Sequence, residues 1–132
     1  MALFYKIAAN CYNKSNKIVG VVKFMTAKDF VELFYNEKNE LIKQYFSNSH
    51  VTEVGFKIDS LGLTENQMAK MKDVLDVVLT DVMYTILLGL DGEASIGGLQ
   101  QIYKLYDENG LELTNSGEIE QYAYEYFHED KQ

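Results

Sequence analysis

The sequence contains no proline, no tryptophan and no arginine, and it has a single cysteine, Cys11. A lone cysteine cannot form an internal disulfide, and in an apolar pattern it is typical of a small core residue. The absence of arginine removes the side chain that makes most bidentate contacts to phosphate and to guanine. Together with a net charge of -8, this absence argues against direct binding of nucleic acid.

Long apolar runs are also missing, because no segment approaches the roughly 18 consecutive apolar residues of a membrane span. The N-terminus has no basic region ahead of an apolar one, and Lys6 interrupts the apolar stretch that a signal peptide would need. With 132 residues, of which 47% are hydrophobic and 24% charged, the chain has the size and composition of one soluble domain. We therefore expect residues 1–132 to form a single cytoplasmic domain that does not bind a membrane.

Residue patterns in the first half of the chain predict three strands and one helix. Two β-branched and aromatic runs, residues 3–11 and 17–25, are separated by a turn-rich segment and predict an antiparallel hairpin. A helix is predicted over residues 27–47, and a break near residues 36–39 is left open. Apolar and polar residues alternate over residues 50–58, which predicts a third strand paired with the hairpin.

The longest periodic segment predicts a central helix. Thr64 and Gln67 form a capping box at its start, and Gly89 or Gly92 should end it. An apolar stripe is expected to face the core, with polar residues on the opposite side. The stripe consists of Met68, Met71, Leu75, Val78, Leu79, Val82 and Ile86, and the polar side consists of Asp73, Asp76 and Thr80.

A second hairpin and a final helix are predicted for the C-terminal third. Residues 100–106 and 111–113 flank an Asn-Gly pair, which is the strongest short hairpin signal. The final helix opens at Ser116, and its apolar stripe consists of Ile119, Tyr122, Ala123, Tyr126 and Phe127. The predicted order is β-β-α-β-α-β-β-α, an α+β fold with a mostly antiparallel sheet and three helices.

No segment carries a complete catalytic or metal-binding pattern. Residues 107–118 resemble a calcium loop, but Gly110 stands two positions before the place where such a loop needs its glycine. The two histidines, His50 and His128, have no metal-ligand or nucleophile motif around them. The glycine-rich segment 89–98 lacks the lysine of a phosphate loop. We therefore expect no cofactor and no enzymatic activity.

Acidic residues are concentrated at the C-terminal end. Residues 1–90 carry ten lysines and ten acidic side chains, whereas residues 91–132 carry ten acidic side chains and two lysines. A patch of one sign repels itself, so its presence is easier to understand if a cationic partner binds there, with tyrosines as anchors. The predicted partner-binding residues are Asp91, Glu93, Tyr103, Tyr106, Glu108, Glu112, Glu118, Glu120, Tyr124, Glu125, His128 and Glu129.

A small acidic chain without Arg, Trp or Pro and with a Tyr-rich acidic tail resembles the immunity proteins of bacterial toxin systems, including those of contact-dependent growth inhibition. The resemblance is one of type, carried by size, by the charge of residues 91–132, and by the segments LLGLDGEASIGG and YKLYDENG. It implies a cytoplasmic inhibitor that binds a cognate toxin domain, which we expect to be basic and to be a nuclease.

Two other functions stay open. The glycine-rich segment 89–98 would suit a small ligand-binding domain or an enzyme, which a metabolite or metal bound to the purified protein would support. Exposed tyrosines and strand edges would suit a self-associating structural protein. A homodimer is also compatible with the immunity role.

Overall fold

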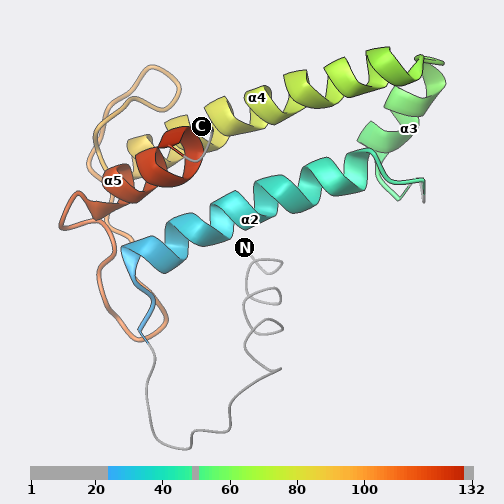
Figure 1. The fold of residues 1–132 in the computed structure, drawn as a ribbon. Helices are drawn as coiled ribbons and strands as arrows, with labels where there is room; N and C mark the ends of the chain where they lie inside the picture. The colour runs from blue at the N-terminus through green and yellow to red at the C-terminus, as the bar shows by residue number, and fades with distance from the viewer. Residues whose placement is uncertain (1–23, 49–50, 130–132) are drawn as a thin grey trace, which may run out of the picture.

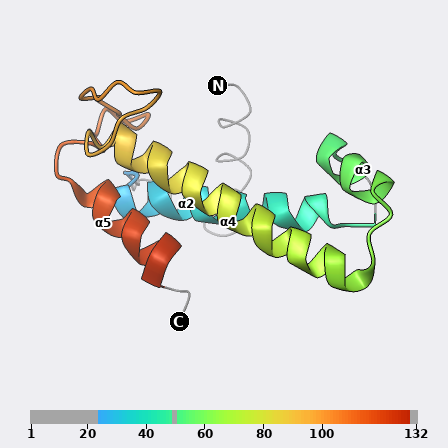
Figure 2. The ribbon, with the colours of Figure 1, turned by 90° about the horizontal axis from the view of Figure 1, so that it is seen from above.

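Four α-helices and one π-helical turn make up the regular structure of residues 24–48 and 51–129, the parts of the chain that the computed structural model describes. They are α2 (Ala27–Tyr45), α3 (Glu53–Ser60), α4 (Glu65–Leu90), α5 (Glu118–Tyr124) and the π-helical turn η1 (Glu125–Glu129). The long helices α2 and α4 run antiparallel, α3 lies at one end of the pair, and α5 packs against both at the other end (Figure 1, Figure 2).

The predicted α+β fold with a mostly antiparallel sheet is wrong for these residues, because they form helices and no sheet. Antiparallel pairing among them is limited to two isolated bridges, Ile96 with Leu99 and Tyr106 with Glu112. Both bridges lie in the long loop between α4 and α5. A single bridge lacks the neighbouring pairs that stabilise a ladder, so the loop closes on itself without forming strands.

The predicted N-terminal hairpin, residues 3–11 and 17–25, lies outside the described part of the chain except for its last two residues. These two, Phe24 and Met25, belong to neither a helix nor a strand.

The third predicted strand, residues 50–58, is helix α3 in the structure. Thr52 caps this helix, since its hydroxyl accepts a hydrogen bond from the Gly55 N–H at 3.0 Å. Gly55 and Ile58 are the buried residues of α3. They are three positions apart, so they lie on the same side of the helix. A Cβ at position 55 would lie 3.2 Å from the Tyr45 carbonyl oxygen. The glycine therefore allows α3 to lie close to the end of α2.

Both long helices begin where the sequence predicted them to begin. In each capping box the threonine hydroxyl accepts the backbone N–H of the third helical residue, whose side chain accepts the threonine N–H. The helix predicted over residues 27–47 is α2, and it runs unbroken to Tyr45. The central helix is α4, and it ends at Leu90, between the two glycines that were expected to close it. The capping pairs are Thr26 with Asp29 and Thr64 with Gln67.

The predicted second hairpin keeps its turn but not its strands. Asp107 organises this turn, because its Oδ1 accepts hydrogen bonds from the N–H groups of Asn109 at 2.9 Å and Leu111 at 2.8 Å. Gly110 takes a φ of 83°, which favours glycine. The Oδ2 of Asp107 accepts the Met25 N–H at 3.1 Å. The turn is thereby tied to the segment just before α2.

The core lies where α5 packs between the first half of α2 and the second half of α4. The apolar stripe predicted for the C-terminal helix is confirmed, since Ile119 and Ala123 are 0% exposed and Phe127 is 1% exposed. They pack in one cluster with Val31 of α2 and Leu87 of α4, both 0% exposed. Complete burial of the four larger side chains, those of Val31, Leu87, Ile119 and Phe127, contributes about 1.5–3 kcal/mol each, so this cluster holds the three helices together.

The central helix α4 differs from the prediction in the side that it turns toward its neighbours. Three residues of the predicted core stripe, Val78, Val82 and Ile86, are 46%, 48% and 37% exposed. On the side expected to be polar, Asp76 contacts Lys38 of α2 at 2.6 Å, and Thr80, one turn later, is 2% exposed. The apolar residues of α4 cover more than one side of the helix, and packing against α2 and α5 uses only part of them.

Candidate functional site

A groove between α4 and α5 brings four of the predicted partner-binding residues together. It opens to solvent and has a volume of about 330 Å³. We call it the α4–α5 groove. Its lining consists of Tyr84 from α4, Gly117 at the start of α5, and Glu120, Gln121, Tyr124, Glu125 and Glu129 from α5 and η1.

The apolar stripe of α5 determines where the groove residues point. Ile119 and Ala123 are buried in the core, and the residue after each is turned by about 100° around the helix axis. Glu120 and Tyr124 therefore lie beside the core rather than in it. Tyr124 is 50% exposed, as predicted for the outward row of Glu120, Tyr124 and His128, but Glu120 is half-buried, and the row runs alongside Tyr84 of α4.

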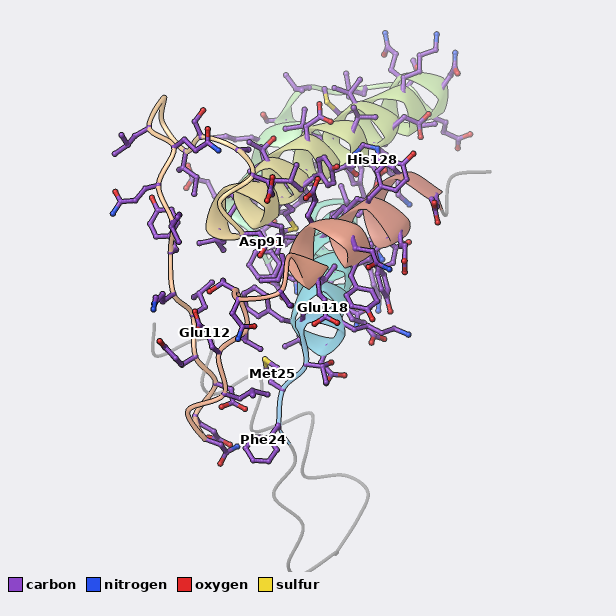
Figure 3. All side chains as sticks on the ribbon, turned by 90° about the vertical axis from the view of Figure 1, so that its left-hand side faces the viewer. Phe24, Met25, Asp91, Glu112, Glu118 and His128 are labelled. Carbon is purple, nitrogen blue, oxygen red and sulfur yellow. The ribbon has the colours of Figure 1, made fainter. Side chains whose placement is uncertain are left out.

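Three rings form the aromatic part of this region. The ring centroids of Tyr84 and His128 lie 4.3 Å apart with the rings nearly perpendicular, and those of Tyr124 and His128 lie 5.6 Å apart. Figure 3 shows His128 where η1 passes alongside α4. The contacts bring Tyr124 and His128 of the C-terminal helix next to Tyr84 of the central helix.

The environment of Tyr84 is unfavourable for a second negative charge. Partial burial raises the pKa of the Tyr84 hydroxyl above its usual value, and the negative charge of Glu120 and the Tyr124 hydroxyl raise it further. Tyr84 therefore stays a neutral hydrogen-bond donor at physiological pH. By the same electrostatics, the negative charge of Glu120 stabilises a cation that enters the groove.

Asp91, one of the predicted binding residues, has a structural role at the end of α4. Helix α5 begins at Glu118, and its N-cap residue, Gly117, has no side chain that could cap the helix. Instead the Asp91 Oδ2 accepts the Glu120 N–H at 3.0 Å, and the carboxylate lies at the positive end of the α5 dipole. The other oxygen, Oδ1, is buried without a hydrogen-bond partner in the described part of the chain. Asp91 thus joins the two helices that enclose the α4–α5 groove.

The other predicted residues lie outside the groove lining. Tyr106 and Glu112 pair across the turn of the long loop, and Glu108 is exposed at its tip. Figure 3 shows Glu112 on this loop, beside the segment that carries Met25. On the same loop Glu93 is exposed and Tyr103 is half-buried, and Glu118 at the start of α5 accepts a hydrogen bond from the Ser116 hydroxyl at 2.9 Å. The structure therefore places four of the twelve predicted residues in the lining of the α4–α5 groove and five on the long loop, while Asp91, Glu118 and His128 belong to neither group.

Sequence reasoning missed Tyr84 and Gln121. A signal for Tyr84 existed, because it precedes Asp91 by seven residues and shares a helix side with it. Gln121 donates a hydrogen bond from Nε2 to the Glu125 Oε1 at 3.1 Å, which holds one carboxylate at the groove.

A second groove lies on the other side of the same carboxylates. It has a volume of about 310 Å³ and is lined by Lys28, Glu125, Tyr126 and Glu129. Glu125 and Glu129 therefore form a ridge between the two grooves. Lys28 gives the second groove a cation of its own, so the α4–α5 groove is the better site for a cationic ligand.

The glycine-rich segment 89–98, an alternative ligand site, has structural uses for at least two of its glycines. A Cβ on Gly89 would lie 2.4 Å from the Ile96 Cγ1, so the glycine allows the loop to pack on α4. Gly92 has a φ of 82° and follows the end of the helix, where the left-handed conformation favours glycine.

Comparison of the chain with protein-family models, curated proteins and solved structures finds no significant match. Within residues 24–48 and 51–129, no group of three or more His, Cys, Asp and Glu side chains could hold a metal ion. None of the helices described is both long and apolar enough to cross a membrane.

Proposed function

We propose that this protein is a cytoplasmic immunity protein that binds a basic cognate toxin domain and blocks it, with the α4–α5 groove as its contact site. The observation that carries the proposal is the gathering of three carboxylates and two tyrosine rings in one open groove. The carboxylates belong to Glu120, Glu125 and Glu129, and the rings to Tyr84 and Tyr124.

Lysine or arginine side chains are the ligands that suit this lining. A volume of about 330 Å³ is at the small end of ligand pockets and is enough for a few protruding side chains. The tyrosine faces attract a cation, and the carboxylates supply the opposite charge. Binding would also relieve the repulsion among the carboxylates.

Inhibition by this route needs no chemistry from the immunity protein. A nuclease binds its substrate through basic side chains, and an acidic aromatic surface complements such side chains. Long-range attraction would make association fast at low salt and slower as ionic strength rises, because at 0.1 M salt the interactions between exposed charges more than about 10 Å apart are largely screened.

The test is affinity capture from the source organism with matched charge variants. The groove variant is Glu120→Gln/Glu125→Gln, and the loop variant Glu108→Gln/Glu112→Gln removes the same charge elsewhere. We expect the wild type and the loop variant to retain one basic protein that the groove variant loses. The captured protein should cleave nucleic acid when freed, and added wild-type protein should stop it.

Two results would contradict the proposal. Equal capture by the groove and loop variants would show that the α4–α5 groove is not the contact site. A captured protein that has no toxic activity, or whose activity the wild type does not inhibit, would exclude the immunity role. Far-ultraviolet circular dichroism of each variant serves as the folding control.

A further inference from the structure

One side of α4 carries a row of exposed apolar side chains. The row follows every fourth residue, so its members lie along the same side of the helix, and from first to last it spans about 18 Å. Soluble proteins rarely leave such a continuous apolar surface uncovered. We call it the apolar row of α4, and it consists of Val74, Val78, Val82 and Ile86, which are 57%, 46%, 48% and 37% exposed.

One end of the apolar row is already an interface. Gly89 lies three residues beyond Ile86, on the same side of α4. The Ile96 side chain of the following loop rests on Gly89, 2.4 Å from where a Cβ would be. The loop thus covers the C-terminal end of the row and leaves the rest open among the described residues.

The chemistry of residues 1–23 suits the open part of the row. This segment contains four lysines and neither aspartate nor glutamate, whereas the rest of the chain is strongly acidic. Asp81 lies three residues from Val78, on the same side of α4, so a lysine over the row meets a carboxylate there. The segment also supplies apolar side chains, namely Leu3, Phe4, Ile7, Ile18, Val19, Val21 and Val22.

The starting point and length of the segment allow it to reach the row. The described chain begins at Phe24, and the Met25 N–H is bound to Asp107 in the loop that follows α4. Figure 1 shows the start of α2 at the same end of the bundle as the end of α4. Twenty-three residues span up to about 75 Å when extended, while the 26 residues of α4 span about 39 Å.

We propose that residues 1–23 pack on the apolar row of α4 in the same chain and complete the core, with lysines of the segment beside Asp81. The docking buries apolar surface that α2 and α5 leave exposed, and it brings a basic segment onto an acidic body. It does not depend on the α4–α5 groove or on the proposed function.

Cys11 offers a direct test because it is the only cysteine and lies in the middle of the segment. A nitroxide spin label on Cys11 of the full-length chain needs no substitution. We expect the label to broaden the methyl signals of Val78 and Val82 strongly and those of Val54, exposed on α3, weakly. Reduction of the nitroxide should restore all of them.

Each other pattern of broadening would overturn the proposal. Equal broadening of α3 and α4, or none on either, would show that the segment does not dock on the row. Broadening seen only between a spin-labelled chain and a separate isotope-labelled chain would mean that a second copy covers the row. Broadening confined to the lining of the α4–α5 groove would place the segment there instead.

Tryptic cleavage of the segment gives an independent readout. Docking protects the peptide bonds after Lys6 and Lys14, and cleavage requires the segment to leave the row. Val78→Ser/Val82→Ser should raise the initial cleavage rate by about tenfold or more, since two apolar contacts are lost. The control Val54→Ser/Leu61→Ser changes similarly exposed apolar residues in and at the end of α3 and should leave the rate unchanged. Equal rates for the two variants would contradict docking on the row.

Discussion

The ion pair between α2 and α4 should respond very differently to removal of its two partners. Lys38 Nζ lies 2.6 Å from Asp76 Oδ1, and the side chains are 5% and 35% exposed. Loss of the carboxylate leaves an ammonium group that water hardly reaches. Loss of the ammonium group leaves a carboxylate that keeps its contact with water, so it costs less.

The magnitudes follow from this difference in exposure. Asp76→Ala should lower the free energy of unfolding by about 3 kcal/mol, the lower end for a broken buried pair, because the pair sits at the edge of the interface. Lys38→Met keeps an apolar stem of similar length but loses the cation that lies 5.4 Å from the centre of the Tyr35 ring, so we expect a loss of about 1 kcal/mol. For a domain of this size, about 4 °C per kcal/mol, the melting temperature should fall by about 12 °C and about 4 °C.

Thermal and urea unfolding followed by circular dichroism would measure both losses. The double variant Lys38→Met/Asp76→Ala should be at least as stable as Asp76→Ala, because it contains no buried unpaired charge. Lys57→Ala is the control: it breaks the pair with Glu53 at 3.0 Å, whose side chains are 76% and 83% exposed, and should change stability by less than about 0.5 kcal/mol. Equal losses for Asp76→Ala and Lys38→Met would refute the reasoning.

Three further predictions concern single polar groups. Thr80→Val should raise the free energy of unfolding by about 1 kcal/mol in urea titrations, because the buried hydroxyl has no partner among the described residues; a loss of stability would show that the hydroxyl is bonded. Asp91→Ala should lower it by about 1 kcal/mol by removing the cap on the Glu120 N–H, whereas Asp91→Asn keeps an acceptor and should lose less; equal losses would contradict the capping role. Partial burial raises the pKa of Asp107, but the N–H groups that it accepts, including that of Met25, outweigh burial and hold the pKa below its usual value. The stability that wild type has over Asp107→Asn should therefore be present above about pH 4 and be lost as the pH falls through the lowered pKa; a difference that stays constant in acid unfolding would be the contrary result.

Local signals in the sequence were enough to predict α2, α4 and α5. A capping box places a helix start by hydrogen bonds within four residues, as at Thr26 and Thr64. The stripe of α5 was predicted correctly because its apolar residues occupy one narrow side of the helix, with acidic residues on the others.

The same reasoning failed where a pattern was short or broad. Over residues 50–58 the alternating apolar residues fit a strand. The structure has a helix there, in which Gly55 lies close to the Tyr45 carbonyl oxygen of α2, a contact with a residue outside the segment. In α4 apolar residues cover more than one side, so periodicity alone did not show that Val78 and Val82 would be exposed while Thr80 is buried.

The candidate site divides in the same way. The row of Glu120, Tyr124 and His128 follows from the helical repeat and could be predicted. Tyr84 belongs to the site because α4 and α5 lie side by side, and Asp91 caps α5 because the two helix ends meet. Neither pairing leaves a local signal strong enough to select these residues.

The sequence by itself determined where the long helices start, which side of α5 is apolar, the acidity of the last third of the chain and the absence of an internal disulfide. These properties depend on residues close together in the chain or on composition. Only the tertiary structure decided which side of α4 is buried, that Lys38 pairs with Asp76, and that Tyr84 joins the acidic groove. Those outcomes depend on contacts between distant segments, where packing of whole helices outweighs the preference of any one of them.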